Sequence, residues 1–440
     1  MKRTPIFALA LLSASAVTAT GQAANEFPSK TRGRVVITDS MPAVKPPIKT
    51  VPIRSDEPSL PTPSPTPIIV GAQGGPSDTA LRPATVPAGN SGSAAGNSLN
   101  KKASFGFIKS RIAEAKRQMQ QRPTATASTS STSAPDESVR IAFHDWKNNN
   151  LDYVVLSKEA FLSTVSEKAA VSQNGRQIIV RTIRGNGVNT PVTLTDETGE
   201  NQLPLLVQYP VVREGRYIET AYYMSTHPGL VTPEVVNAGK YYVHNVIEIA
   251  RQRLREKGII IQPKVADIAE RLAAVEHVDH LRFRTEFHPN IYNDVYTLFA
   301  LNEGQTYRYS VSSAGAGGMV QMIPATYRMV RSWHPNVPLT PDFVDGMRNH
   351  ANASQAMLLY MQRTWNDLIA SPTVANAFSS GIATQEQLMA AGYNSNPARL
   401  AGYIKRGGAN WTSLIPRETK VYLQIYESVE KFVPMTPRTR

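Results

Sequence analysis

The sequence contains no cysteine among its 440 residues. This absence excludes disulfide bonds, zinc sites built on cysteine, catalysis by a thiol and a lipid anchor attached to an N-terminal cysteine. A second absence is that of long apolar runs. Beyond residue 24 no segment reaches the length of about 20 apolar residues that a membrane-spanning helix needs. We therefore expect no membrane span after the N-terminal segment.

The N-terminus has the pattern of a secretory signal peptide. Lys2 and Arg3 precede an apolar stretch from Ile6 to Val17, and small residues then lead to Ala23 and Ala24. A charged start, an apolar centre and a small-residue cleavage site define such a peptide. The alternative is a membrane anchor, for which about 12 apolar residues are too few. We predict a signal peptide over residues 1–23 and a periplasmic or secreted mature protein.

Basic residues outnumber acidic ones, and the formal net charge is +13. Cleavage of the signal peptide would remove Lys2 and Arg3 and leave +11. An exported protein with this excess favours an anionic polymer or surface, such as cell wall, lipid headgroups or nucleic acid. No zinc-finger, RNP or helix-turn-helix pattern is evident, so we expect no nucleic-acid partner.

Residues 24–138 are rich in Pro, Ser, Thr, Ala and Gly. Such segments bury too little apolar surface to offset the entropy of ordering them, and we predict a disordered tether. One basic island, residues 101–121, carries Phe105, Phe107, Ile112 and Met119. It is either a short amphipathic helix that docks on a partner or an anionic surface, or a transient helix within the tether.

The chain then changes character twice. Short runs of β-branched residues separated by Gly and Asn turns, such as Ile178–Ile183, predict a small β-rich domain over residues 139–231. That domain shows no recognisable chemistry. From Pro233 onward, apolar residues recur at helical spacing, which predicts a mostly α-helical domain over residues 232–440.

Two glutamates lie at the ends of apolar helical stripes and are candidate acids. Glu303 follows the stripe Ile291, Val295, Phe299 and precedes Gly304, which is typical of a helix end. A carboxylate there opposes the helix dipole, whereas a protonated carboxyl does not and can act as a general acid. Glu276 ends a similar stripe, and helical periodicity alone does not decide between the two glutamates.

Four motifs occur in order along the second half of the chain. Glu303 lies nine positions before Ser312, which opens a turn of small residues. Two further motifs include Tyr393 with Asn394, and Glu418 with Tyr422. The residues that carry the motifs are Glu303; Ser312, Gly315, Ala316, Gly318 and Gln321; Gly392-Tyr393-Asn394-Ser395-Asn396-Pro397-Ala398-Arg399; and Pro416-Arg417-Glu418-Thr419 with Tyr422. Together they resemble the lytic transglycosylases that cut bacterial cell-wall glycan.

The resemblance implies a fold and a site. The fold would be a mostly α, lysozyme-like catalytic domain, preceded by the small β-rich domain and the disordered Pro/Ser/Thr-rich N-terminal region. Glu303 would be the single acid and base, and Tyr393 would orient it by a hydrogen bond. The substrate-binding residues would be Ser312, Gly318, Met319, Gln321, Tyr393 and Asn394. No cofactor or metal is implied.

The chain departs from the family pattern at several positions. Gly304 replaces the usual Ser, Arg308 replaces a Pro, and Ser395-Asn396 replaces Ala-Gly. These differences leave Glu276 as an alternative acid. Without the family, Met319 would be an ordinary core residue and Tyr393 an ordinary core or groove aromatic.

The expected reaction cleaves the MurNAc–GlcNAc β-1,4 bond and leaves a 1,6-anhydroMurNAc end on peptidoglycan. One alternative is hydrolysis with Glu276, Glu286 or Asp294 as a second carboxylate. Another is a catalytically silent peptidoglycan-binding envelope protein whose tether reaches a partner. A third is a metal enzyme using the run from Glu276 to His280. His277 and His280 form a feasible ligand pair there, but no His-Glu-x-x-His motif is present.

Overall fold

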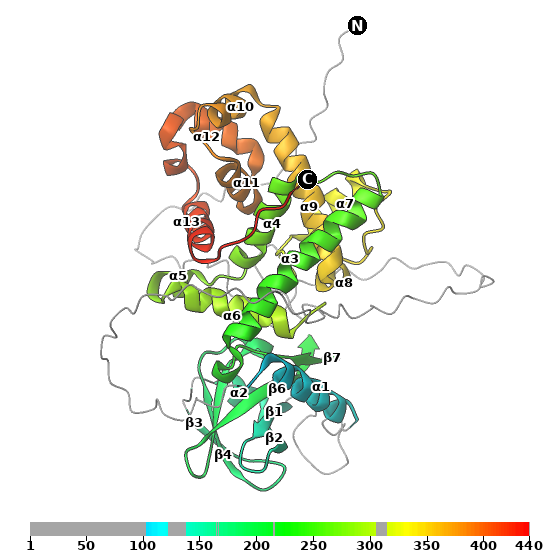
Figure 1. The fold of residues 1–440 in the computed structure, drawn as a ribbon, viewed down its shortest axis with the longest axis vertical. Coiled ribbons are helices and arrows are strands. Elements are labelled where there is room, and N and C mark those ends of the chain that lie inside the picture. The colour runs from blue at the N-terminus through cyan, green and yellow to red at the C-terminus, as the bar shows by residue number, and fades with distance from the viewer. Residues whose placement is uncertain are drawn as a thin grey trace, which may run out of the picture. The chain divides into compact units, whose positions relative to one another are not determined.

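The structure is a computed structural model that describes residues 103–121, 138–163, 165, 167–213, 216–304 and 315–439. The predicted signal peptide, most of the predicted tether and Ser312 lie outside the described residues. Figure 1 shows the helices and strands with the labels used below.

Within these described residues, seven strands form one antiparallel sheet in the order β2-β1-β6-β5-β4-β3, and β7 pairs with β6 beside this path. Their bounds are β1 (Ser138–Asp145), β2 (Asn150–Ser157), β3 (Glu167–Val171), β4 (Gln177–Thr182), β5 (Val192–Asp196), β6 (Asn201–Arg213) and β7 (Arg216–Tyr223). The long β6 pairs with β1, β5 and β7, so it links the two halves of the sheet. A short helix, α2 (Lys158–Leu162), follows β2.

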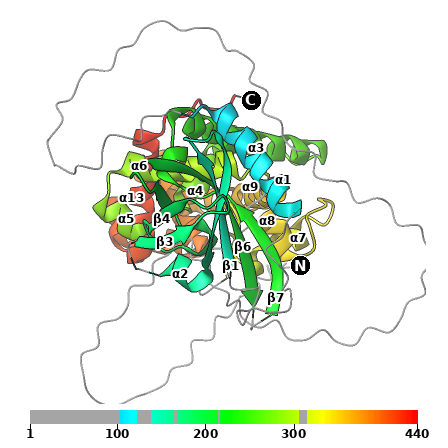
Figure 2. The same cartoon turned by 90° about the horizontal axis from the view of Figure 1, so that it is seen from below.

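The sheet curls into a half-barrel (Figure 2). Its register shifts at Ala142/Phe143 and at Val211/Val212, and such irregularities bend strands. The curl brings the far side back toward β2, where the Gln173 amide donates to the Tyr153 carbonyl over 2.8 Å. The concave side holds an apolar core that includes Ile141, Phe143 and Val180, all fully buried.

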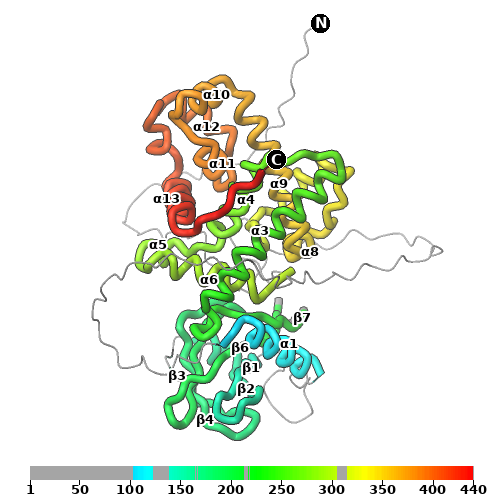
Figure 3. The backbone as a smooth tube through the Cα atoms, in the orientation of Figure 1, coloured from blue at the N-terminus to red at the C-terminus, as the bar shows by residue number. Residues whose placement is uncertain are grey.

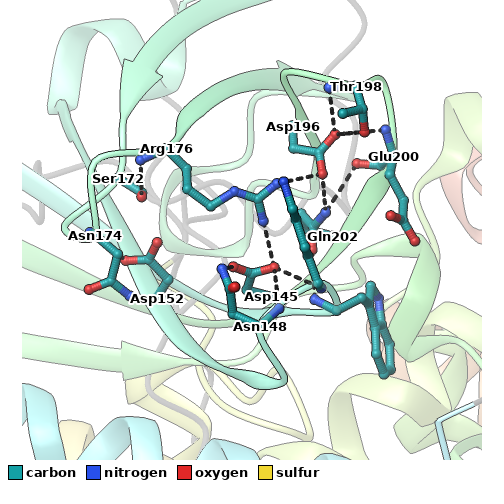
Figure 4. Close-up of polar contacts among 12 residues, drawn as sticks. Asp145, Asn148, Asp152, Ser172, Asn174, Arg176, Asp196, Thr198, Glu200 and Gln202 are labelled. Carbon is teal, nitrogen blue, oxygen red and sulfur yellow. Dashed lines mark hydrogen bonds and ion pairs between the residues drawn. The ribbon is translucent and has the colours of Figure 1, made fainter.

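A buried arginine joins the turns at one end of the half-barrel (Figure 4). The Arg176 guanidinium lies 2.5 Å from Asp145 and 2.7 Å from Asp196, and its side chain is only 9% exposed. Burial alone would raise the pKa of both carboxyls. Their hydrogen bonds, including those from Arg176, instead hold each pKa below its usual value. Gln202 also donates to Asp196 over 2.9 Å, so the network fixes how the hairpins meet.

Helix α1 (Phe105–Gln121) packs on the half-barrel along β6 (Figure 2). Ile108, Ile112, Ala115 and Met119 form its buried stripe. They share a core with the outward side of β1 and β6 and with residues of the helical region, such as Leu301. The strand β1 is therefore buried on both faces, since Ile141 points to one core and Ala142 to the other.

The region after β7 is helical. Its α-helices are α3 (Pro233–Glu256), α4 (Pro263–Val275), α5 (His280–Thr285), α6 (His288–Leu301), α7 (Pro324–Trp333), α8 (Phe343–Arg348), α9 (His350–Ile369), α10 (Pro372–Ser379), α11 (Gln385–Asn394), α12 (Leu400–Gly407) and α13 (Arg417–Phe432). Short 3-10 turns of this region are η3 (Pro228–Leu230), η4 (Pro397–Arg399) and η5 (Gly408–Ser413), whereas η2 (Gly187–Asn189) lies between β4 and β5. One large apolar core runs through these helices.

Two close approaches fix this helical region. Helix α3 packs against α6, and a Cβ added to Gly239 would lie only 1.9 Å from the Tyr296 carbonyl oxygen. After α13 the backbone runs back toward α3 and α4 (Figure 3). There the Arg438 guanidinium lies 2.9 Å from Asp267 and 2.5 Å from Glu270, with its side chain 4% exposed.

The fold class predicted from the sequence is wrong. The sequence predicts a mostly α, lysozyme-like catalytic domain preceded by a small β-rich domain and a disordered N-terminal region, but the described residues form a curled antiparallel half-barrel over residues 138–223, followed by a helical region. The basic island also does not belong to a tether. It forms α1, whose apolar stripe packs on the outer face of the half-barrel and shares a core with it. The motifs describe short helix ends and turns, and such local features do not determine how elements pack over long range.

Candidate functional site

The candidate acid lies at the corner that ends α6. Asn302 caps this helix, and its side chain bonds both backbone groups of Met224, which follows β7. Glu303 and Gly304 come next, and Gly304 has a φ of +80°, a conformation that favours glycine. The bonds of Asn302 therefore fix the corner to the end of β7, and the positive φ of Gly304 lets the chain turn away from the helix axis.

Glu303 is mostly enclosed and carries an ion pair. Its side chain is 18% exposed, and one carboxylate oxygen lies 2.8 Å from the Lys109 ammonium of α1. The partner residues are 194 positions apart in the sequence. The contact therefore joins the start of the chain's described part to the corner that ends α6.

Two titratable side chains lie beneath the same corner. The Gly304 amide donates to the Tyr242 hydroxyl oxygen over 2.5 Å, and the Tyr242 hydroxyl lies 2.7 Å from Nδ1 of His350. Burial raises the pKa of Tyr242 well above its usual value. Burial also lowers the pKa of His350 to about 3, so this imidazole is neutral at neutral pH. The amide occupies one lone pair of the phenol, which leaves the phenol proton for Nδ1.

The turn of small residues is tightly folded where the structure describes it. Gly317 and Met322 form a β-bridge, and Gly318 has a φ of +68°. Gln321 also adopts a left-handed conformation, with a φ of 48°, and its side-chain amide donates to the Gly318 carbonyl over 2.7 Å. That bond stabilises a backbone conformation that is uncommon for a residue with a side chain.

The corner and the turn meet at one place, the junction of α8 and α9. The His350 amide donates to the Gly304 carbonyl over 3.2 Å. Three residues earlier, the Met347 carbonyl oxygen lies so close to Gly318 that an added Cβ would approach it to 2.1 Å. The same junction therefore anchors the residue after the candidate acid and the glycine in the centre of the turn.

His277 links the turn to α6. Its Nε2 lies 3.0 Å from the Met319 carbonyl, and since a carbonyl only accepts, this nitrogen carries the proton. The His277 ring makes an edge contact with Phe299 at 5.2 Å between centroids, and Phe299 makes another with His350 at 6.3 Å. Burial lowers the pKa of His277 to about 4, so this histidine is also neutral.

The two downstream motifs join the same assembly. The Tyr393 hydroxyl donates to the Val320 carbonyl of the turn over 2.6 Å. The neighbouring Asn394 accepts a bond from the Thr419 hydroxyl over 2.9 Å in a buried setting. Tyr422, from the fourth motif, donates to a carboxylate oxygen of Glu276 over 2.6 Å. Segments far apart in the sequence therefore form one bonded cluster around the turn.

The run from Glu276 to His280 has structural partners. Glu276 accepts from Tyr422, His277 bonds the Met319 carbonyl, and Asp279 caps α5 by accepting two backbone amide bonds. Within the residues that the structure describes, no three His, Asp or Glu side chains are grouped so as to hold a metal ion.

The predicted residues take different positions. Glu303, Gln321 and Tyr393 are partly exposed, whereas Met319 is fully buried and Asn394 is nearly so. The Met319 side chain thus belongs to the core, and it has no exposed surface with which to contact a glycan in this structure. As substrate-binding residues, Gly318, Gln321, Tyr393 and Asn394 remain predictions, and Ser312 lies outside the described residues.

Sequence reasoning missed Lys109, Tyr242 and His350. Lys109 belongs to the basic island, which had no link in the sequence to Glu303. Tyr242 lies on a long helix whose apolar spacing gave no sign of a polar contact. His350 opens α9 directly after Asn349, and that capping residue was the one local signal that this histidine lies at a helix junction.

Comparisons with known proteins did not identify a relative of this chain. Searches of family models, of curated proteins and of solved structures found no significant match to this chain. In the described ranges, no helix combines the length and the apolar character that crossing a bilayer requires.

Proposed function

We propose that this protein is a lytic transglycosylase that cuts peptidoglycan glycan strands, with Glu303 as its acid and base. The observation that carries the proposal is the meeting of Glu303–Gly304 and the small-residue turn at the α8–α9 junction. Further support comes from Tyr393, which bonds that turn, and from the order of the four motifs. The predicted signal peptide agrees with action in the periplasm or outside the cell.

The reaction needs one carboxyl. Protonated Glu303 gives its proton to the oxygen that links MurNAc to GlcNAc, and the bond from that oxygen to C1 breaks. The Glu303 carboxylate then takes the proton of the MurNAc C6 hydroxyl. The freed oxygen bonds to C1, which closes the 1,6-anhydro ring and returns Glu303 to its protonated form.

A hydrolytic glycosidase is the second candidate, because Glu276 belongs to the same bonded cluster. The Tyr422 hydroxyl holds it, and its neighbour His277 bonds the Met319 carbonyl. A hydrolytic glycosidase uses a second carboxylate, and Glu276 would supply it. The two candidates differ in their products, since hydrolysis adds one water to each fragment and an anhydro end lacks it.

The deciding experiment compares two matched variants of the full chain on purified peptidoglycan, with mass analysis of the released fragments. We expect anhydro fragments from the wild type, a loss of at least about 100-fold in Glu303→Gln, and a smaller loss in Glu276→Gln. Hydrated fragments whose release depends on both glutamates would favour hydrolysis. Cleavage that survives in Glu303→Gln would refute the assignment, and strand binding without any cleavage would favour a binding protein.

A further inference from the structure

The ion pair at Glu303 is built by a helix that is firmly fixed. The buried stripe of α1 fixes its backbone on the half-barrel, and the Phe105 amide at its start donates to Glu234 of α3 over 2.8 Å. The Lys109 side chain itself is 44% exposed. The ammonium group can therefore leave Glu303 by rotation of its own long side chain, without undocking of the helix.

The other polar groups at this corner do not take the place of Lys109. Burial raises the pKa of Tyr242 from α3 and lowers the pKa of His350 from α9, so both side chains are uncharged at neutral pH. Arg348, at the end of α8, is bound to Glu219 of β7. Of these groups, Lys109 is the cation whose contact with the Glu303 carboxyl is seen, at 2.8 Å.

Resting on the proposed function, we propose that Lys109 is a positioning and specificity residue that exchanges Glu303 for a carboxylate of the glycan strand. While Lys109 is paired with Glu303, the ammonium occupies a carboxyl oxygen that has to face the glycosidic oxygen. A carboxylate on a bound strand draws the ammonium away and frees the Glu303 carboxyl to meet the bond that is cleaved. The substrate class is thus a glycan with carboxylates beside the cleaved bond.

The test measures kcat/KM on two forms of the same glycan strands, one with free carboxylates and one with these carboxylates amidated. The full chain is compared as wild type, Lys109→Met, Lys109→Arg and, as a matched control on the exposed side of α1, Lys116→Met. We expect the wild type to prefer the charged strands by about threefold to tenfold, the size of one partly exposed charged contact. Lys109→Arg and Lys116→Met should keep this preference.

Lys109→Met should lose the preference and cleave amidated strands faster than the wild type does. A purely structural role for Lys109 would lower both rates together and leave their ratio unchanged, and that result would overturn the inference. Cleavage that persists in Glu303→Gln would instead overturn the proposed function. If no variant turns over, equilibrium binding decides, since equal binding of charged strands by wild type and Lys109→Met also refutes the exchange.

Discussion

Replacing Gly239 by alanine tests whether the contact between α3 and α6 is as close as described. In a helix interior, alanine is more favourable than glycine by about 1 kcal/mol, so propensity alone predicts a more stable protein. The structure predicts the opposite, because the new Cβ would lie 1.9 Å from the Tyr296 carbonyl oxygen and 2.6 Å from its carbon. Both contacts are with backbone, which cannot move aside as a side-chain end can.

The size of the effect follows from the overlap. Carbon and oxygen approach each other to about 3.3 Å at the closest, so α3 and α6 must separate by more than 1 Å. Overpacking of this kind costs about 1–3 kcal/mol. Since the contact is backbone to backbone, we expect the upper end, and a net loss of about 2 kcal/mol after the gain in propensity. The melting temperature should fall by about 4–8 °C.

Gly402 provides the matched control, because it lies on the exposed side of α12 with nothing within 4 Å of an added Cβ. Gly402→Ala should raise the melting temperature by a few degrees, in contrast to Gly239→Ala. Thermal unfolding followed by circular dichroism reports both. An unchanged or raised melting temperature in Gly239→Ala would refute the described packing, and with it the placement of the α6 end that carries Glu303.

Three further predictions concern the turn, the buried histidines and the half-barrel. Gly318→Ala combines a left-handed φ with a clash at the Met347 carbonyl, whereas Gly304→Ala has the left-handed φ alone. We expect losses in the free energy of unfolding of about 3 and about 1 kcal/mol, respectively, and similar values in denaturant titrations would contradict the close approach. Burial lowers the pKa of His227 and His350 to about 3 and that of His277 to about 4, below the ordinary value of about 6.5. The unfolded chain therefore binds more protons below pH 6.5, and the stability present above that pH should fall toward pH 4 by about 1.4 kcal/mol per pH unit and histidine. Urea midpoints at pH 7, 6 and 5 measure this slope, and a slope that His350→Gln leaves unchanged would argue against a buried neutral imidazole. Arg176→Met leaves Asp145 and Asp196 buried without their cation and should cost about 3–5 kcal/mol, whereas the exposed Arg181→Met should cost less than about 1 kcal/mol. Equal melting temperatures for these two variants would show that the network in Figure 4 does not stabilise the sheet.

The sequence was informative where the signal is local. The β-branched run at residues 178–183 lies at β4 (Gln177–Thr182), and Pro233 opens α3 as expected. The stripe of Ile291, Val295 and Phe299 is the buried side of α6, and Gly304 follows the helix end with a positive φ. β-branched runs, helical spacing, proline and glycine each constrain a few neighbouring residues, and these constraints hold in the folded chain at the positions just named.

The long-range contacts could not be read in this way. No pattern in residues 101–121 shows that its apolar stripe packs on the protein's own sheet, because an amphipathic helix is the same whichever surface it covers. The curl of the sheet depends on register shifts at Ala142/Phe143 and Val211/Val212, and the residue types of the strands do not predict where such shifts occur. For the same reason the pairing of Lys109 with Glu303 had no signal in the sequence.

The position of α1 has a consequence for how the chain reaches its final state. This helix is made before the strands and helices on which it packs, and its first contact with α3 joins Phe105 to Glu234, 129 residues later. The stripe of α1 first meets residues of β1 and β6, and the surface that it covers is complete only when the start of α3 and the end of α6 have been added. We therefore expect α1 to dock after the half-barrel has formed, with its contact to α3 added later.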